Sequence, residues 1–230
     1  LETGIGSIGD ISNNLIIGIG AAAENDWDYT GEIDEARVWR KALTTTEVRE
    51  NMHRTIDSCE PNLISCWQFN EVSGDVLDVV GQYNGTVSGA TRINSTAPIG
   101  SGTANTQIET NGLVTFTGTD YSANYVIQDG ATVTATKINL SPHGTTGIDP
   151  ADAPLDNQYW VVNRFEKTGN FSAEMTFAMD EDILASDEAN PAGMVLYYRA
   201  FNSDGAWMNL ANGFSASDAN NTVTFTNIPS

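Results

Sequence analysis

The sequence predicts an all-β protein made of two β-sandwich units, of which the first also carries one short helix. Glycine, threonine, asparagine and serine are abundant, a composition suited to turns and strands. Apolar and polar residues alternate in many short runs, which is the period of a half-buried strand. At 230 residues the chain exceeds the ~100–200 residues of an ordinary domain, so we expect two domains.

The expected boundary lies in residues 97–102, which are small, uncharged and typical of a linker. It divides the chain into a first unit, 1–98, and a second unit, 99–230. In the first unit, apolar runs bounded by turn residues predict strands at 14–20, 31–40, 63–70 and 85–93.

One helix is expected in the first unit, between two of its strands. Thr44 and Glu47 have the spacing of a capping box, in which each side chain accepts a hydrogen bond from the backbone of the other residue. Pro61 prevents a long continuation. We therefore predict a helix of about three turns that ends near Asp57.

The second unit carries at least seven strand patterns, at 113–117, 125–128, 132–138, 159–165, 173–179, 194–201 and 222–226. Asp129-Gly130 and Asp204-Gly205 lie between such runs, and these dipeptides favour tight hairpin turns. A parallel sheet is not expected, because its strands would alternate with helices and the sequence shows no such alternation. The second unit is therefore expected to be an immunoglobulin-like or small jelly-roll sandwich.

The charge of the chain is strongly acidic, with 30 acidic and 10 basic residues and a formal net charge of −20. This charge repels phosphate backbones and anionic membrane surfaces, so nucleic acid is not an expected partner. Membrane insertion is not expected either, because no apolar run approaches the ~20 residues needed to cross a bilayer. The acidic charge is compatible with calcium, and equally with a solvated surface that keeps an extracellular protein in solution. Because the chain starts at Leu1 with no leader pattern, we expect a piece of a larger protein or a processed product.

The two cysteines, Cys59 and Cys66, flank a turn-forming Glu-Pro-Asn segment. In an oxidising compartment this arrangement predicts a disulfide, and two free thiols are the alternative.

Patterns that point to catalysis are incomplete. The glycines of residues 4–9 match a dinucleotide-binding pattern, but neither a preceding strand nor a following helix is predicted. Glu32 and Asp34 match the first two positions of an ExDxE-type glucanase signature, whereas Ala36 takes the place of its second catalytic glutamate. Because a retaining glycosidase needs two carboxyl groups, no catalytic site is expected.

The segment 31–44, followed by Glu47-Val48, resembles the closing signature of laminin-G-like jelly rolls, in the concanavalin A-like lectin/glucanase superfamily. Residues 63–71, with Ser73-Gly74, Asp78 and 84–86, resemble the strand and loop that accompany such domains. The resemblance covers about residues 1–100. It implies that the first unit is the C-terminal part of a jelly roll whose missing strands come from outside this chain.

Asp34 is the residue on which a calcium site would depend. It shares a predicted strand face with Ala36, so it is expected in the core or at its rim, where a carboxylate needs partners. One interpretation is a structural hydrogen-bonding role. The other is calcium, with Asn25, Asp26 and Asp28 of the preceding loop supplying further oxygens, as in related modules.

Trp27 and Tyr29 are candidate ligand-binding residues, because aromatic rings can stack on sugars, although core packing is the commoner fate of such side chains. The second unit resembles sandwich regions of large secreted proteins from gliding bacteria, through residues 159–165, 187–191 and 204–207. That resemblance implies export by the type IX secretion machinery.

The sequence favours a non-catalytic binding or adhesion region of a secreted or cell-surface protein, with a glycan or a surface protein as partner. Two alternatives stay open. One is an accessory region of a secreted polysaccharide-degrading enzyme, and the other is a structural spacer or secretion-passenger segment.

Overall fold

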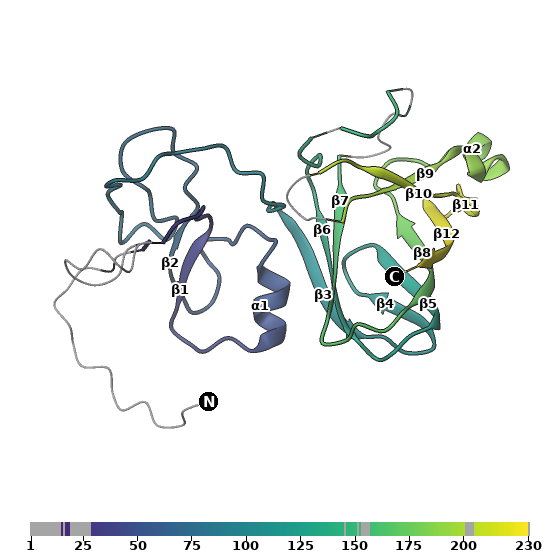
Figure 1. Ribbon diagram of the computed structural model, residues 1–230, viewed down its shortest axis with the longest axis horizontal. Coiled ribbons are helices and arrows are strands. Elements are labelled where there is room, and N and C mark those ends of the chain that lie inside the picture. The colour runs from purple at the N-terminus through teal and green to yellow at the C-terminus, as the bar shows by residue number, and fades with distance from the viewer. Residues whose placement is uncertain are drawn as a thin grey trace.

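The computed structural model describes residues 15, 17–18, 29–144, 146–150, 152, 157–200 and 205–229 (Figure 1). Strands make up 38% of the chain and helices 8%, in several antiparallel sheets, so the mostly-β class is confirmed. Within these ranges, no helix is long and apolar enough to cross a membrane.

The N-terminal part contains a two-stranded antiparallel ribbon of β1 (Ala36–Trp39) and β2 (Leu63–Trp67), with helix α1 (Thr45–Asn51) between them in sequence. The strands predicted at 31–40 and 63–70 are thus present but shorter. No strand forms at 85–93, where only Gly85 makes an isolated bridge, to Val76. Most of the strand predicted at 14–20 lies outside the described residues.

Helix α1 starts as predicted. The Thr44 side chain accepts a hydrogen bond from the Glu47 amide (3.2 Å), and the Glu47 carboxylate accepts from the Thr44 amide (2.7 Å), so the capping box is confirmed.

The helix ends at Asn51, earlier than the predicted end near Asp57. Tertiary contacts explain the difference, because Thr55 donates its backbone N–H to the carbonyl of Gly100 (2.9 Å). The Arg37 guanidinium also donates a hydrogen bond to the Asn51 carbonyl at the end of the helix (2.6 Å). The chain therefore leaves the helix to pair with the start of the second unit.

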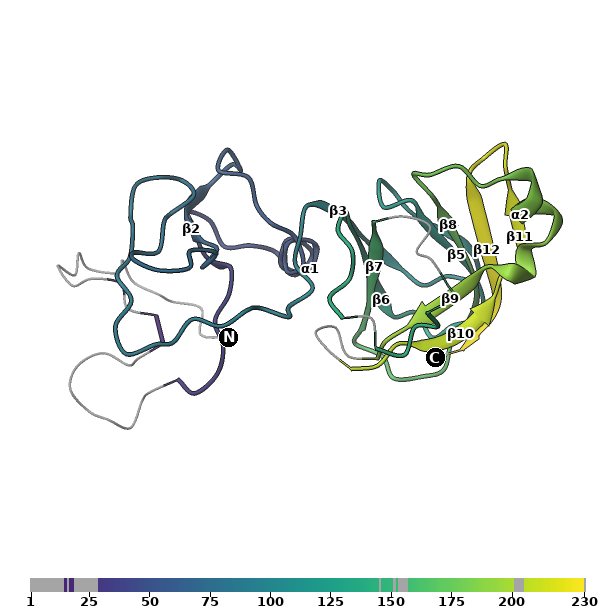
Figure 2. The ribbon, with the colours of Figure 1, turned by 90° about the horizontal axis from the view of Figure 1, so that it is seen from above.

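Among its described residues, the second part contains ten strands: β3 (Gly102–Ile108), β4 (Gly112–Phe116), β5 (Tyr121–Ile127), β6 (Thr132–Ile138), β7 (Tyr159–Phe165), β8 (Ser172–Ala178), β9 (Val195–Tyr198), β10 (Met208–Asn212), β11 (Ser215–Ser217) and β12 (Thr222–Pro229). They form a five-stranded sheet in the order β11-β12-β8-β5-β4, a three-stranded sheet β3-β6-β7 and a ribbon β10-β9. Two short helices, α2 (Ala185–Ala189) and η1 (Pro191–Gly193), lie between β8 and β9. Figure 2 shows the two larger sheets facing each other.

The core lies between these two sheets, where alternate residues of each strand point inward. Phe177 is central, with its ring centroid 4.8 Å from that of Trp160 and 5.1 Å from that of Tyr121. The other buried members of the core are Val114, Phe116, Ala123, Tyr125, Val133, Ala135, Ala173, Met175, Val223, Phe225 and Ile228. Each of the seven predicted strand patterns of this part overlaps a strand, although the bounds differ: the pattern at 194–201 forms a strand only over Val195–Tyr198, and residue 201 lies outside the described residues.

Strand β3 was not predicted, because its sequence, Gly-Thr-Ala-Asn-Thr-Gln-Ile, lacks apolar alternation. The strand is an edge of its sheet, and α1 lies beside it in both views (Figures 1 and 2). The Glu50 carboxylate of α1 accepts a hydrogen bond from the Thr106 backbone N–H (2.8 Å). The Glu50 side chain thus accepts from a backbone N–H group that would otherwise be unpaired at the edge of the sheet.

Residues 97–102, predicted as a linker, are closely packed. A Cβ on Gly100 would lie 2.7 Å from Cγ2 of Ile138, and one on Gly102 would lie 1.9 Å from the Lys137 carbonyl oxygen. Both positions therefore require glycine for close approach to β6. The division into 1–98 and 99–230 stays a prediction. The segment itself is hydrogen bonded to residues 53–55 through Gly100, and Gly102 pairs with Ile138 of β6.

Candidate functional site

Tyr29, one of the two aromatic residues proposed for ligand binding, is exposed, with 57% of its surface accessible. Its hydroxyl donates to the Glu32 carbonyl (3.1 Å) and its backbone N–H donates to the Gly18 carbonyl (2.8 Å). The ring lies against Gly31, where a Cβ would come within 2.7 Å of Cζ. The ring is therefore held in one orientation on the surface.

Asp34 turns its carboxylate toward its own backbone, accepting a hydrogen bond from the Glu35 N–H (2.9 Å). Glu35 has a φ of 50°, in the left-handed region, so the strand begins only at Ala36. Its carboxylate points to the Arg37 guanidinium (2.9 Å), and both side chains are largely buried. The predicted strict alternation through Glu32, Asp34 and Ala36 is therefore not formed.

The other proposed calcium ligands, Asn25, Asp26 and Asp28, and the second aromatic residue, Trp27, lie outside the described residues. Within the described ranges, no group of three or more His, Cys, Asp or Glu side chains is arranged to hold a metal ion. The calcium site stays a prediction, because Asp34 is the one proposed ligand that lies within the described residues.

The predicted disulfide is wrong in this structure, where Cys59 and Cys66 are free thiols. Cys59 lies exposed in the turn before β2, whereas β2 carries Cys66 into the interior, where it is 0% exposed. A strand rises ~3.3 Å per residue, so Cys66 lies ~10 Å along β2 from Leu63, the residue at which the strand leaves the turn. The strand therefore carries Cys66 away from the turn that holds Cys59. Burial, followed by the charge of Glu35, raises the pKa of Cys66 to about 11, so its thiol stays protonated.

Asp78 organises the loop after β2. Its buried carboxylate accepts four backbone N–H groups, from Cys66, Val80, Gln82 and Tyr83, at 2.9–3.3 Å. Burial raises the pKa of Asp78, but the four hydrogen bonds lower it by more. Asn84 in turn accepts from the Asp78 N–H (3.0 Å), which explains the Asp78–Asn84 spacing as a structural requirement.

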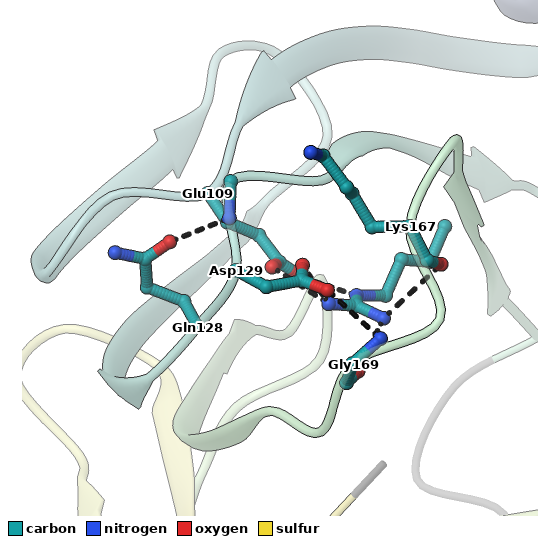
Figure 3. Close-up of polar contacts among 7 residues, drawn as sticks. Glu109, Gln128, Asp129, Lys167 and Gly169 are labelled. Atoms are coloured by element: carbon teal, nitrogen blue, oxygen red, sulfur yellow. Dashed lines mark hydrogen bonds and ion pairs between the residues drawn. The ribbon is translucent and has the colours of Figure 1, made fainter.

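Arg164 is the centre of an ionic cluster, whose partners Glu109, Asp129, Lys167 and Gly169 are drawn in Figure 3. Its guanidinium donates twice to Glu109, at 2.7 and 3.1 Å, and also to the carboxylate of Asp129. The remaining donors reach the carbonyls of Lys167 (3.4 Å) and Gly169 (2.8 Å). All five N–H groups are therefore used within the protein, which identifies this cluster as a clamp between β7 and the three loops that follow β3, β5 and β7.

His53 and Asn163 connect α1 to the outer surface of the three-stranded sheet. His53, only 6% exposed, places Nδ1 3.2 Å from the Pro98 carbonyl oxygen and Nε2 2.8 Å from Nδ2 of Asn163. A neutral ring with its proton on Nδ1 satisfies both contacts, donating to Pro98 and accepting from Asn163. Burial lowers the pKa of His53, against a smaller opposing effect of the Pro98 hydrogen bond.

A second contact of α1 lies nearby. The guanidinium of Arg49 lies 4.2 Å from the ring centroid of Phe165, and it also pairs with Glu166 (2.8 Å). The two parts of the chain are therefore held by packing, ionic and neutral hydrogen-bonding contacts together. Sequence analysis missed this interface, because its residues are spread over positions 49–166 without a local pattern.

Comparison with known proteins finds no family model, no curated protein and no solved structure that matches this chain.

Proposed function

We propose that this chain is a non-catalytic, extracellular binding region that recognises glycans. The observation that carries the proposal is Tyr29, an exposed aromatic ring anchored through its hydroxyl and supported by Gly31. A ring held with one face toward solvent is suited to stacking on a sugar, and little conformational freedom is lost on binding. Trp27 is proposed as its neighbour in the same contact.

The non-catalytic part of the proposal is supported by the surroundings of Asp34, the second position of the glucanase-like pattern. Asp34 accepts a backbone hydrogen bond, Ala36 stands where the pattern has its second glutamate, and the neighbouring Glu35 is paired with Arg37. A retaining glycosidase instead needs one carboxylate free to attack and one protonated partner about 5 Å away. We therefore expect no hydrolysis of polysaccharides by this chain.

The test is binding to a panel of immobilised glycans by wild type, Tyr29→Ala and Tyr83→Ala. Tyr83 is a matched control, because it is also an exposed tyrosine (56%). We expect at least a tenfold loss for Tyr29→Ala and no change for Tyr83→Ala. Equal binding by all three proteins would refute the role of Tyr29, and release of reducing sugar would support the alternative of a polysaccharide-degrading enzyme.

Calcium belongs to the proposal as a bound ion at Asp34, with Asn25, Asp26 and Asp28 as the other ligands. The glycan panel is therefore repeated with EDTA, and calcium is titrated by calorimetry into wild type and Asp34→Asn. No heat and no shift in Tm with calcium would remove this part. Export by the type IX machinery stays a prediction, tested by locating the protein in a secretion-deficient strain.

A further inference from the structure

The outer face of the five-stranded sheet carries an unbroken row of hydroxyl groups. Strand register places Thr115 opposite Ser122, Ser122 opposite Thr176, Thr176 opposite Thr224 and Thr224 opposite Ser215. The row therefore crosses every strand of the sheet. None of the five residues is buried, so the hydroxyls are accessible to solvent.

This face is almost free of charge, in a protein that has 30 acidic residues. Outward positions can be identified because they alternate with the buried residues of each strand. They are occupied by threonine, serine, asparagine, alanine, leucine and valine, with Glu174 as the one charged side chain among them. The chain as a whole is strongly acidic, whereas this sheet face is nearly neutral, with the exposed apolar side chains of Leu113 and Val126 beside its polar residues.

The hydroxyls are held in fixed positions. The Oγ1 atoms of Thr176 and Thr224 lie 2.9 Å apart and hydrogen bond to each other. Threonine is β-branched and has restricted χ1 rotamers, which limits the freedom of the row further. The inward residues Met175, Phe177 and Phe225 are buried, and a register shift would expose them.

We propose that this surface, the hydroxyl face, binds an extended, neutral polysaccharide. A hydroxyl both donates and accepts, so it matches sugar hydroxyls in either orientation. One such hydrogen bond contributes little net affinity in water. The strands are ~4.8 Å apart, so the row presents five hydroxyl groups in succession to a single ligand chain. A neutral ligand also leaves no charge to be desolvated, whereas a charged polymer would find one carboxylate and no cation here.

The inference rests on the proposed glycan-binding function and assigns it a second contact surface. Its test is retention of the full chain on insoluble neutral polysaccharides, namely cellulose, chitin and a β-1,3-glucan. The test variant is Thr176→Val with Thr224→Val, which keeps the branched shape of the side chains and removes both hydroxyls. Thr176→Ser with Thr224→Ser restores the hydroxyls, and Thr91→Val, in an exposed loop, is the control.

We expect at least tenfold weaker retention for the double valine variant, and wild-type retention for the double serine variant and the control. Retention should not change between about 50 and about 500 mM salt, because no ion pairs are formed. Circular dichroism and Tm check that the valine variant is folded. If the double valine variant does not fold, two single variants replace it in the test. Thr115→Val, which removes one hydroxyl, is expected to weaken retention, and Glu174→Gln, which removes the one charge on this face, is expected to leave retention unchanged.

Three outcomes would overturn the inference. Retention unaffected by the double valine variant would place glycan binding elsewhere and leave the proposed function intact. Self-association through the same face, seen as a dimer that the valine variant changes, would reassign it to contact between copies. No retention on any glycan, together with no binding to the immobilised panel, would refute the proposed function as well.

Discussion

The Nε2 atom of His53 lies 2.8 Å from the amide nitrogen of Asn163, and this contact joins the end of α1 to β7 across 110 positions of the chain. Both partners are neutral hydrogen-bonding groups in a buried interface, so the contact depends on the protonation state of the ring. A second proton on Nε2 would place an N–H against the Asn163 NH₂ group. The ionisation of His53 is therefore coupled to the association of the two parts.

Stability should decrease in mild acid because of His53. Its pKa in the folded protein is lowered by burial, so the unfolded chain binds the proton first as the pH falls. The contribution of the neutral ring is complete above about pH 6.5 and is lost as the pH falls through the folded-state pKa. Urea unfolding between about pH 7.5 and pH 5 measures it. His53→Gln should flatten this part of the profile, and parallel profiles for both proteins would contradict the assignment.

Removing the charge of Arg164 should be strongly destabilising. Arg164→Leu leaves Glu109, with a side chain only 1% exposed, without its bidentate partner. Breaking a buried pair in this way costs about 3–5 kcal/mol in free energy of unfolding. Lys41→Met, which breaks the exposed pair with Glu47, is the control and should leave the free energy of unfolding almost unchanged. Equal losses for both variants in urea unfolding would show that Arg164 is not a clamp.

The two cysteines should differ in reactivity. Cys59 is exposed, whereas Cys66 is buried with a pKa raised to about 11. A thiol reagent at neutral pH should label one cysteine in the native protein and both in urea. Reducing agent should leave Tm unchanged. A decrease in Tm on reduction, or one missing label under denaturing, non-reducing conditions, would restore the disulfide prediction.

Asp78→Asn should destabilise the loop after β2. The substitution keeps the shape of the side chain but turns an NH₂ group toward backbone N–H donors. Leaving buried groups of this kind unsatisfied costs about 1–3 kcal/mol each. Asp75→Asn, at an exposed position of the same loop, should leave the free energy of unfolding unchanged. Hydrogen exchange at Val80 and Tyr83 should rise in the first variant alone.

Local patterns predicted the features that depend on neighbouring residues. Alternation placed β8 and β12, because a strand that buries one face requires an apolar residue at every second position. The Thr44–Glu47 capping box placed the start of α1, because both of its hydrogen bonds form within four residues.

The sequence by itself thus determined the mostly-β class, the acidic charge and the positions of most strands in the second part. The tertiary structure decided where α1 ends, how the polar strand β3 is covered, and that Cys66 is buried apart from Cys59. It also decided that hydroxyls from five separate strands form one row. These features depend on contacts between residues far apart in the chain, whose free energies no local pattern contains.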